Sequence, residues 1–266
     1  MGTGIELARR LGAVVRGSKH FVPGFAAVEH PEEPGRYYLF TDTTPQSRLP
    51  WEIYVATDGR RFMAEDLPSV DDREHALMQR PDLTFWAIYD QRIADEALWF
   101  FANGIVARLS KDQVAAAFAK RHPSFVQAAT IDELAERTAL PVPVLRQTIT
   151  TYNQAVATGR DALGRQHLPR AIERAPFYAV KHGGLSAVSF AGLAVDESLR
   201  VIREDGKPIP SIYAAGEILG FALLNGGSYC SGMGITPALT FGRLLGQRIL
   251  HWRTGQDAAG RQSATA

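Results

Sequence analysis

The chain has 266 residues, of which 45% are hydrophobic and 21% are charged, so it can bury the core of one large domain or two smaller ones. Its 29 basic and 28 acidic residues give a net charge of +1, which provides no broad attraction for nucleic acid or anionic lipid. A single cysteine, Cys230, excludes an internal disulfide framework and a cysteine-based metal cluster. No apolar run approaches the roughly 20 residues of a membrane span, and we expect a globular, cytoplasmic protein.

The first 62 residues predict a helix from about 5 to 12, a short strand at 13–15, and two strands at 36–42 and 51–62. An Asp58-Gly59 turn closes the last of these strands. No strand precedes the first helix. In α/β architecture such a helix normally follows a strand of the same sheet, so the chain is expected to begin within a fold.

From about residue 70 to 160 the pattern is helical, as in DDREHALMQ and KDQVAAAFAKR. TIDELAERT contains a predicted capping box of Thr130 and Glu133, and PVPVLRQTITTYNQAVATG is expected to end at Gly159. This segment is predicted to be a separate, mostly helical lobe.

The remaining chain returns to β structure in GLAVDESLRVIREDGKPIPSIYAAGE, with a turn at Asp205-Gly206. A last helix is expected from Pro237 to about Trp252, and the tail is expected to be disordered. The apolar side chains expected to face inward on this helix are Ala238, Leu239, Phe241, Leu245 and Ile249.

The stretch LLNGGSYCSGMGITPALTFGR, residues 223–243, follows the apolar strand IYAAGE, which ends at Gly216 and Glu217. Glycines in this loop permit a close backbone approach; they are Gly226, Gly227, Gly232 and Gly234. Thr236 is expected to be the N-cap of the last helix, whose free N–H groups would favour an electron-rich ligand. The alternative is an ordinary strand–loop–helix connection.

Taken together, IYAAGE and YCSGMGITPALTFGR closely resemble the C-terminal flavin-binding segment of the fumarate reductase and succinate dehydrogenase flavoprotein superfamily. The order of GTGIELARRLGA, GRRFMAED, APFYAV and GLAVDESLRVIREDGKPIPSIYAAGE is similar to that family across nearly the whole chain. The likeness is nearer to ketosteroid and tricarballylate dehydrogenase-like members than to true fumarate reductases.

This resemblance implies an α+β chain: an incomplete FAD-binding α/β domain with an inserted, mostly helical capping domain. The expected parts are residues 1–60 and 176–255 of the FAD-binding domain, the capping domain at 61–175, and a disordered tail at 256–266. It also implies the cofactor FAD, with Glu217 at its ribityl chain and the backbone of Gly234 and Ile235 at its flavin ring. Gly216, Gly232 and Thr236 complete the expected cofactor site, and no metal is expected.

The family's N-terminal βαβ unit, with its glycine-rich loop, should precede this sequence. We therefore expect the C-terminal part of a flavoprotein, whether a cloned fragment, a truncated gene product or one half of a split enzyme. Gly2-Thr3-Gly4 also lacks the family's aspartate. A separate N-terminal FAD-domain chain is a possible partner.

The resemblance also bears on the substrate. Fumarate reductases bind carboxylate with an arginine where Tyr229 stands and with a His-Thr pair where Val188 and Ser189 stand. Each missing charge-assisted hydrogen bond is worth roughly 1.5–3 kcal/mol, which disfavours fumarate and succinate. Tyr229 is instead the expected catalytic electrophile for a neutral carbonyl, with Ser231 beside it. The alternative for both residues is packing alone.

Other candidates have competing interpretations. Cys230 is a redox group or a small buried hydrophobe, and His182 is an acid–base group or a capped or solvent-facing histidine. Arg60 and Arg61 are expected to form structural ion pairs. The proton-transfer residue of the capping domain remains open among three tyrosines, Tyr54, Tyr89 and Tyr152.

Two functions follow. The first is an FAD-dependent oxidoreductase that acts on CH–CH groups next to a carbonyl of a small-molecule substrate. The second is a non-catalytic remnant, or a subunit of a split flavoprotein that needs a partner chain.

Overall fold

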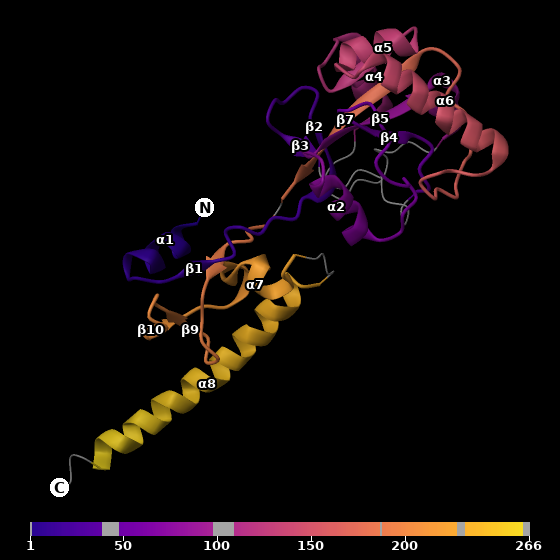
Figure 1. Ribbon diagram of the computed structural model, residues 1–266. Coiled ribbons are helices and arrows are strands. Elements are labelled where there is room, and N and C mark those ends of the chain that lie inside the picture. The colour runs from indigo at the N-terminus through magenta and orange to yellow at the C-terminus, as the bar shows by residue number, and fades with distance from the viewer. Residues whose placement is uncertain (1, 39–47, 98–108, 187, 228–231, 263–266) are drawn as a thin grey trace. The chain divides into compact units, whose positions relative to one another are not determined.

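The computed structural model describes residues 2–38, 48–97, 109–186, 188–227 and 232–262 (Figure 1). The chain divides into two compact units. Residues 23–185 form the central unit, and residues 1–22 with 186–266 form the flanking unit.

An antiparallel six-stranded sheet forms the centre of the central unit. Its strand order is β3-β2-β7-β5-β4, and β6 also pairs with β7. The strands are β2 (Gly24–Glu29), β3 (Tyr37–Tyr38), β4 (Ile53–Ala56), β5 (Thr84–Asp90), β6 (Phe125–Ala128) and β7 (Phe177–Leu185). The long strands β5 and β7 pair over their whole shared length, from Thr84 opposite Gly183 to Asp90 opposite Phe177.

Both faces of this sheet are covered, because alternate residues of its strands enter different hydrophobic clusters. Trp86 and Ile88 of β5 enter the larger cluster, whereas Phe85 and Ala87 enter the smaller one. Helices α4, α5 and α6 contribute to the larger cluster and α2 to the smaller (Figure 1). The helices of this unit are α2 (Val70–Met78), α3 (Gln91–Glu96), α4 (Lys111–Ala119), α5 (Ile131–Thr138) and α6 (Val142–Thr158).

The helix signals of this region are largely confirmed. Thr130 accepts a hydrogen bond from the Glu133 backbone N–H, and Gly159 ends α6 with φ 67°. The reciprocal half of the capping box is wrong, since the Glu133 carboxylate accepts from the N–H of Ala129 rather than from Thr130. Between 61 and 175 the described helices outnumber the strands, but β5 and β6 belong to a sheet that β2, β3, β4 and β7 complete.

The flanking unit contains two short antiparallel ladders, β1 (Val15–Arg16) with β8 (Gly192–Leu193) and β9 (Arg200–Ile202) with β10 (Pro208–Tyr213). Its helices are α1 (Thr3–Arg10), the 3₁₀ helix η1 (Gly216–Leu219), α7 (Phe221–Asn225) and α8 (Ile235–Gln262). Ala8, Leu193, Val201, Ile209 and Leu219 are at the centre of its core. The predicted turn at Asp205-Gly206 joins β9 to β10, with φ 77° at the glycine.

Main chain packs directly on main chain in this unit at two glycines. A Cβ atom at Gly192 would lie 2.0 Å from the carbonyl carbon of Leu219, and one at Gly220 would lie 2.4 Å from the carbonyl oxygen of Phe190. Any side chain at these positions would separate β8 from η1, so glycine fixes their close approach.

Several boundaries differ from the sequence-based expectations. The compact units divide near residues 22 and 185, because strands before residue 60 pair with β5 and β7, and the division into FAD-binding and capping domains at 60 and 175 stays a prediction. Helix α8 begins at Ile235 and continues to Gln262, into the stretch expected to be a disordered tail. Leu239, expected to face inward, is 69% exposed. The roles of the two units as FAD-binding and capping domains stay predictions.

Among the described residues, no helix combines the length and the apolar character needed to cross a membrane.

Candidate functional site

Three parts of the flanking unit line a pocket of about 540 Å³: the start of α1, the residues 186, 188 and 189, and η1. The lining residues are Gly2, Thr3, Gly4, Ile5, Ser186, Val188, Ser189, Glu217 and Ile218. Glu217, Val188 and Ser189 were identified from separate motifs. The fold brings all three to one pocket.

The position of Glu217 depends on the turn between β10 and η1. Strand β10 ends at Tyr213, so IYAAGE is a strand only in its first residues. Gly216 has φ 82°, which lets the chain enter η1 with the Glu217 side chain exposed. Across the pocket, a Cβ atom at Gly4 would lie 2.8 Å from Cδ1 of Ile218, so glycine at the start of α1 permits the contact with η1.

The pocket combines acceptor side chains with the first turn of α1, whose backbone N–H groups are donors. Ser186 donates its hydroxyl hydrogen to the carbonyl of Val188, and Ser189 donates its own to the carbonyl of Ala191, both at 2.8 Å. The Ser186 oxygen also accepts from the Val188 N–H at 3.4 Å, which leaves it one lone pair, while the lone pairs of Ser189 and of the Glu217 carboxylate remain available. The described lining contains no lysine, arginine or histidine. The acceptor side chains favour a ligand that offers hydroxyl or N–H groups.

The beginning of α8 differs from the expected cap. The N–H groups of Ile235 and Thr236 donate to the carbonyl of Gly232, at 3.2 and 2.9 Å. The helix begins at Ile235, so Thr236 lies inside its first turn and is not the N-cap; that prediction is wrong. Gly232 has φ 87°, in the left-handed region that favours glycine. Gly234 as a flavin contact stays a prediction, and Tyr229, Cys230 and Ser231 lie outside the described residues.

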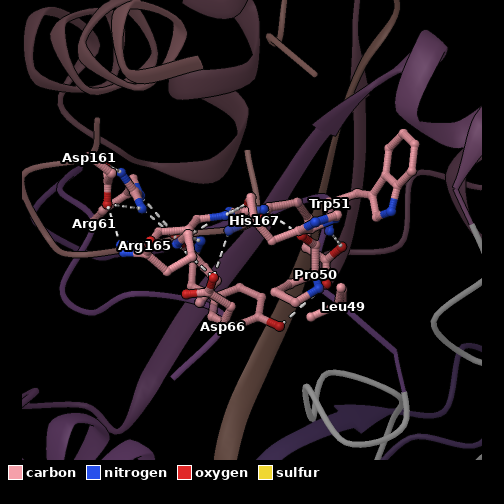
Figure 2. A network of polar contacts seen from close by, with 12 residues as sticks. Leu49, Pro50, Trp51, Arg61, Asp66, Asp161, Arg165 and His167 are labelled. Carbon is pink, nitrogen blue, oxygen red and sulfur yellow. Dashed lines mark hydrogen bonds and ion pairs between the residues drawn. The ribbon is translucent and has the colours of Figure 1, made fainter. Parts of the chain in front are cut away.

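A buried ionic network in the central unit explains the GRRFMAED motif (Figure 2). Arg61 pairs with Glu65 and Asp161, each at 2.6 Å, and Glu65 also pairs with Arg165 at 3.0 Å. Arg61 is thus confirmed as a structural ion-pair former. Arg60 is exposed and forms no ion pair with any residue that the structure describes.

The charges of this network stabilise one another. Burial opposes the charge of Arg61, but Glu65 and Asp161 raise its pKa above the ordinary value. Burial likewise opposes ionisation of Asp161, and the hydrogen bond and charge of Arg61 hold the pKa of this carboxyl below its usual range. The sequence did not identify Asp161 as the partner of Arg61 or Arg165 as the partner of Glu65. The repeated glycine-arginine pattern of GRDALGR was the available signal.

The acid–base candidates of the central unit are buried. His182 stacks on Phe85 with ring centroids 5.0 Å apart, and its Nδ1 lies 2.9 Å from the carbonyl oxygen of Val180. Burial lowers the pKa of His182 to about 4, which favours a neutral, packed histidine. Burial raises the pKa of Tyr54, Tyr89 and Tyr152, the last to about 12. Their burial gives no reason to prefer one for proton transfer.

Comparisons with known proteins agree with the motif order. The chain is 29% identical over 195 residues to "Probable fumarate reductase Ifc3" of Shewanella frigidimarina, covering 73% of this chain and 30% of that protein. It is 29% identical over 221 residues to 3-oxosteroid 1-dehydrogenase of Mycolicibacterium smegmatis, covering 73% and 37%. The chain therefore spans about a third of the length of these curated relatives.

The fold is shared with a solved structure, 3-ketosteroid Δ1-dehydrogenase from Sterolibacterium denitrificans in complex with 1,4-androstadiene-3,17-dione. The TM-score is 0.68 at 21% identity, and the match covers 93% of this chain and 46% of that one. The FAD binding domain family matches residues 1–235. The expected cofactor, FAD, is confirmed by this match. The chain belongs to the FAD binding domain family of flavoproteins.

Proposed function

We propose that this chain is part of an FAD-dependent oxidoreductase that acts on a CH–CH bond next to a neutral carbonyl. The observation that carries the proposal is the pocket of the flanking unit, where acceptor groups of Glu217, Ser186 and Ser189 meet and the described lining has no cation.

These residues fit the ribityl part of FAD. A ribityl chain offers hydroxyl donors, and the Glu217 carboxylate together with the two serine oxygens offers acceptors. The glycines at 2 and 4 leave backbone without side chains along the same pocket. FAD, when bound, supplies the hydride chemistry that no side chain of this protein can supply.

The residues that stand in place of the fumarate reductase clamp favour a different substrate class. A dicarboxylate substrate needs cationic or strongly donating side chains at its carboxylates. Val188 and Ser189, where fumarate reductases carry His-Thr, add no positive charge. A neutral ketone or enone has no such requirement. We assign the polarisation of its carbonyl to Tyr229, with Ser231 nearby, on the basis of the loop motif.

A second function is supported by exposed apolar side chains of the flanking unit. Leu7 of α1 is 64% exposed, Leu223 of α7 is 52% exposed, and Ile235 and Leu239 of α8 are each 69% exposed. Such side chains favour association with another polypeptide. In this alternative, the chain is a subunit or remnant that completes its FAD site only with a partner chain.

Flavin absorbance of the purified chain, measured together with its native mass, separates the two functions. A yellow monomer whose flavin is bleached anaerobically by a cyclic ketone, and not by succinate, supports the oxidoreductase. A colourless protein that takes up FAD only when a partner chain is added supports the second function. Bleaching by succinate as fast as by the ketone would contradict the proposed substrate class.

A further inference from the structure

The central unit contains a second pocket, of about 320 Å³, apart from the pocket of Glu217. It lies among α3, α4, β6 and the ends of β5 and β7, and all of its lining residues belong to the central unit. Its volume lies near the lower end of the range for small-molecule sites, which limits an occupant to about one ring with a substituent.

Aromatic rings form the apolar part of this pocket. Tyr89 and Tyr178 stack with centroids 5.1 Å apart and an interplanar angle of 13°. Phe118 approaches Tyr178 at 5.1 Å and 64°, in an edge contact. Tyr89 is buried, whereas Tyr178 remains partly exposed. A planar ring can extend this cluster by stacking or edge contacts, which a saturated ring cannot reproduce.

One side of the pocket is already occupied by internal hydrogen bonds. The Tyr178 hydroxyl donates to Oε1 of Gln91 at 2.5 Å, and Nε2 of Gln91 donates to Oδ1 of Asp95 at 2.7 Å. These hydrogen bonds hold the Tyr178 ring in place and leave a carboxylate, that of Asp95, in the lining, where Arg174 pairs with its other oxygen at 3.7 Å. A ligand with two anionic groups would place one of them toward this carboxylate, which is unfavourable.

Two further polar side chains of the pocket, Lys111 and Gln127, carry the argument for a ligand. Among the residues that the structure describes, Lys111 makes no ion pair and the side-chain amide of Gln127 makes no hydrogen bond. Lys111 is also the first residue of α4, whose positive dipole end adds to its charge. A single anionic group is therefore favoured beside Lys111, and Gln127 can donate an N–H to it.

We propose that this pocket binds a planar, single-ring monocarboxylate, with the ring on Tyr178 and Phe118 and the carboxylate at Lys111 and Gln127. This site is independent of FAD and of the flanking pocket. Its occupant is a ligand of the central unit rather than the oxidisable substrate.

Calorimetric titration of the purified chain with benzoate tests the site. Cyclohexanecarboxylate is the control without an aromatic face, and benzamide is the control without charge. We expect benzoate to bind about 3- to 10-fold more tightly than cyclohexanecarboxylate because of the aromatic contacts. Lys111→Gln should weaken benzoate by about 5-fold and leave benzamide unchanged, because an exposed charge contributes up to about 1 kcal/mol.

Two matched variants locate the binding. Lys120→Gln removes an exposed lysine just past the other end of the same helix and should leave benzoate affinity unchanged. Gln127→Leu should weaken the binding of benzoate and of benzamide alike. All of these substitutions lie outside the hydrophobic core, and circular dichroism confirms that each variant folds. Equal affinities for benzoate and cyclohexanecarboxylate, equal effects of the two lysine variants, or no measurable benzoate binding would each overturn the proposal.

Discussion

Arg61 and Asp161 stand a hundred positions apart in the sequence and form a buried ion pair of 2.6 Å in the central unit. Through Glu65, which pairs with both Arg61 and Arg165, the turn after β4 is tied to the connector that follows α6 (Figure 2). This network holds together the entry to the helical segment and the return from it. Its function is structural, since each charge is paired within it.

The network should be sensitive to the loss of its central carboxylate. Glu65→Gln leaves Arg61 and Arg165 buried with less compensating charge, which we expect to lower the free energy of unfolding by about 3–5 kcal/mol. Urea denaturation followed by tryptophan fluorescence measures this, because Trp86 is buried in the same unit. Glu6→Gln, in an exposed ion pair with Arg10, is the control and should change little. A loss as small as that of the control would show that the network does not stabilise the fold.

Glu74 is a buried carboxyl of α2 that should make the free energy of unfolding fall as pH rises. A carboxylate in an ion pair has the opposite effect. Burial, followed by the charge of Asp71, raises the pKa of Glu74 to about 7. The folded state therefore holds a proton that the unfolded state releases above about pH 4.3. This contribution to stability is full below that pH and is lost as pH rises through 7.

Glu74→Gln should remove this dependence, because the amide cannot ionise. At pH 8 we expect the variant to be more stable than the parent by on the order of 1–3 kcal/mol, and near pH 4 the two should be nearly equal. Denaturant midpoints measured across this range check the prediction. Parallel curves for the two proteins would mean that Glu74 is ionised in the folded state.

Tyr229 should affect chemistry far more than cofactor binding. In an FAD-loaded enzyme, Tyr229→Phe should retain the flavin and slow its reduction by a ketone on the order of 100- to 1000-fold, because one oxyanion donor is lost. Substrate binding should weaken much less, since the hydrogen bond strengthens as negative charge develops. Single-turnover flavin reduction at several ketone concentrations measures both the reduction rate and the substrate binding. Tyr229→Arg should instead confer weak affinity for fumarate. An unchanged rate of flavin reduction in the Phe variant would show that Tyr229 serves only in packing.

Local signals predicted the helices well and the sheet poorly. Thr130 as N-cap and Gly159 as C-terminal glycine mark the ends of α5 and α6, because caps depend on neighbouring residues only. Strand β5, TFWAIYD, was not recognised, because it is buried on both faces and reads as a continuous apolar run without alternation. Its pairing with β7 spans about ninety positions of sequence, which no local pattern encodes.

The site residues also divide into those that a local motif identifies and those whose contacts depend on distant parts of the chain. The motif order was enough to select Glu217 and the position of Ser189, and the fold places both in one pocket. The cap at Thr236 was misplaced, because the loop glycine at 232 already satisfies the first N–H groups of α8. The pairing of Arg61 with Asp161 could not be predicted from spacing, since it depends on how two distant loops fold together.

We propose that the pocket containing Glu217 holds the ribityl part of FAD, and titration of the purified chain with FAD, followed by flavin fluorescence, tests this. We expect saturable binding that Glu217→Ala weakens by about 10-fold or more, because a hydrogen bond to a charged group is worth roughly 1.5–3 kcal/mol. Glu6→Ala, an exposed carboxylate on α1 outside the lining, should bind FAD like the parent. Equal FAD affinity in the Glu217 variant and the parent would contradict the account.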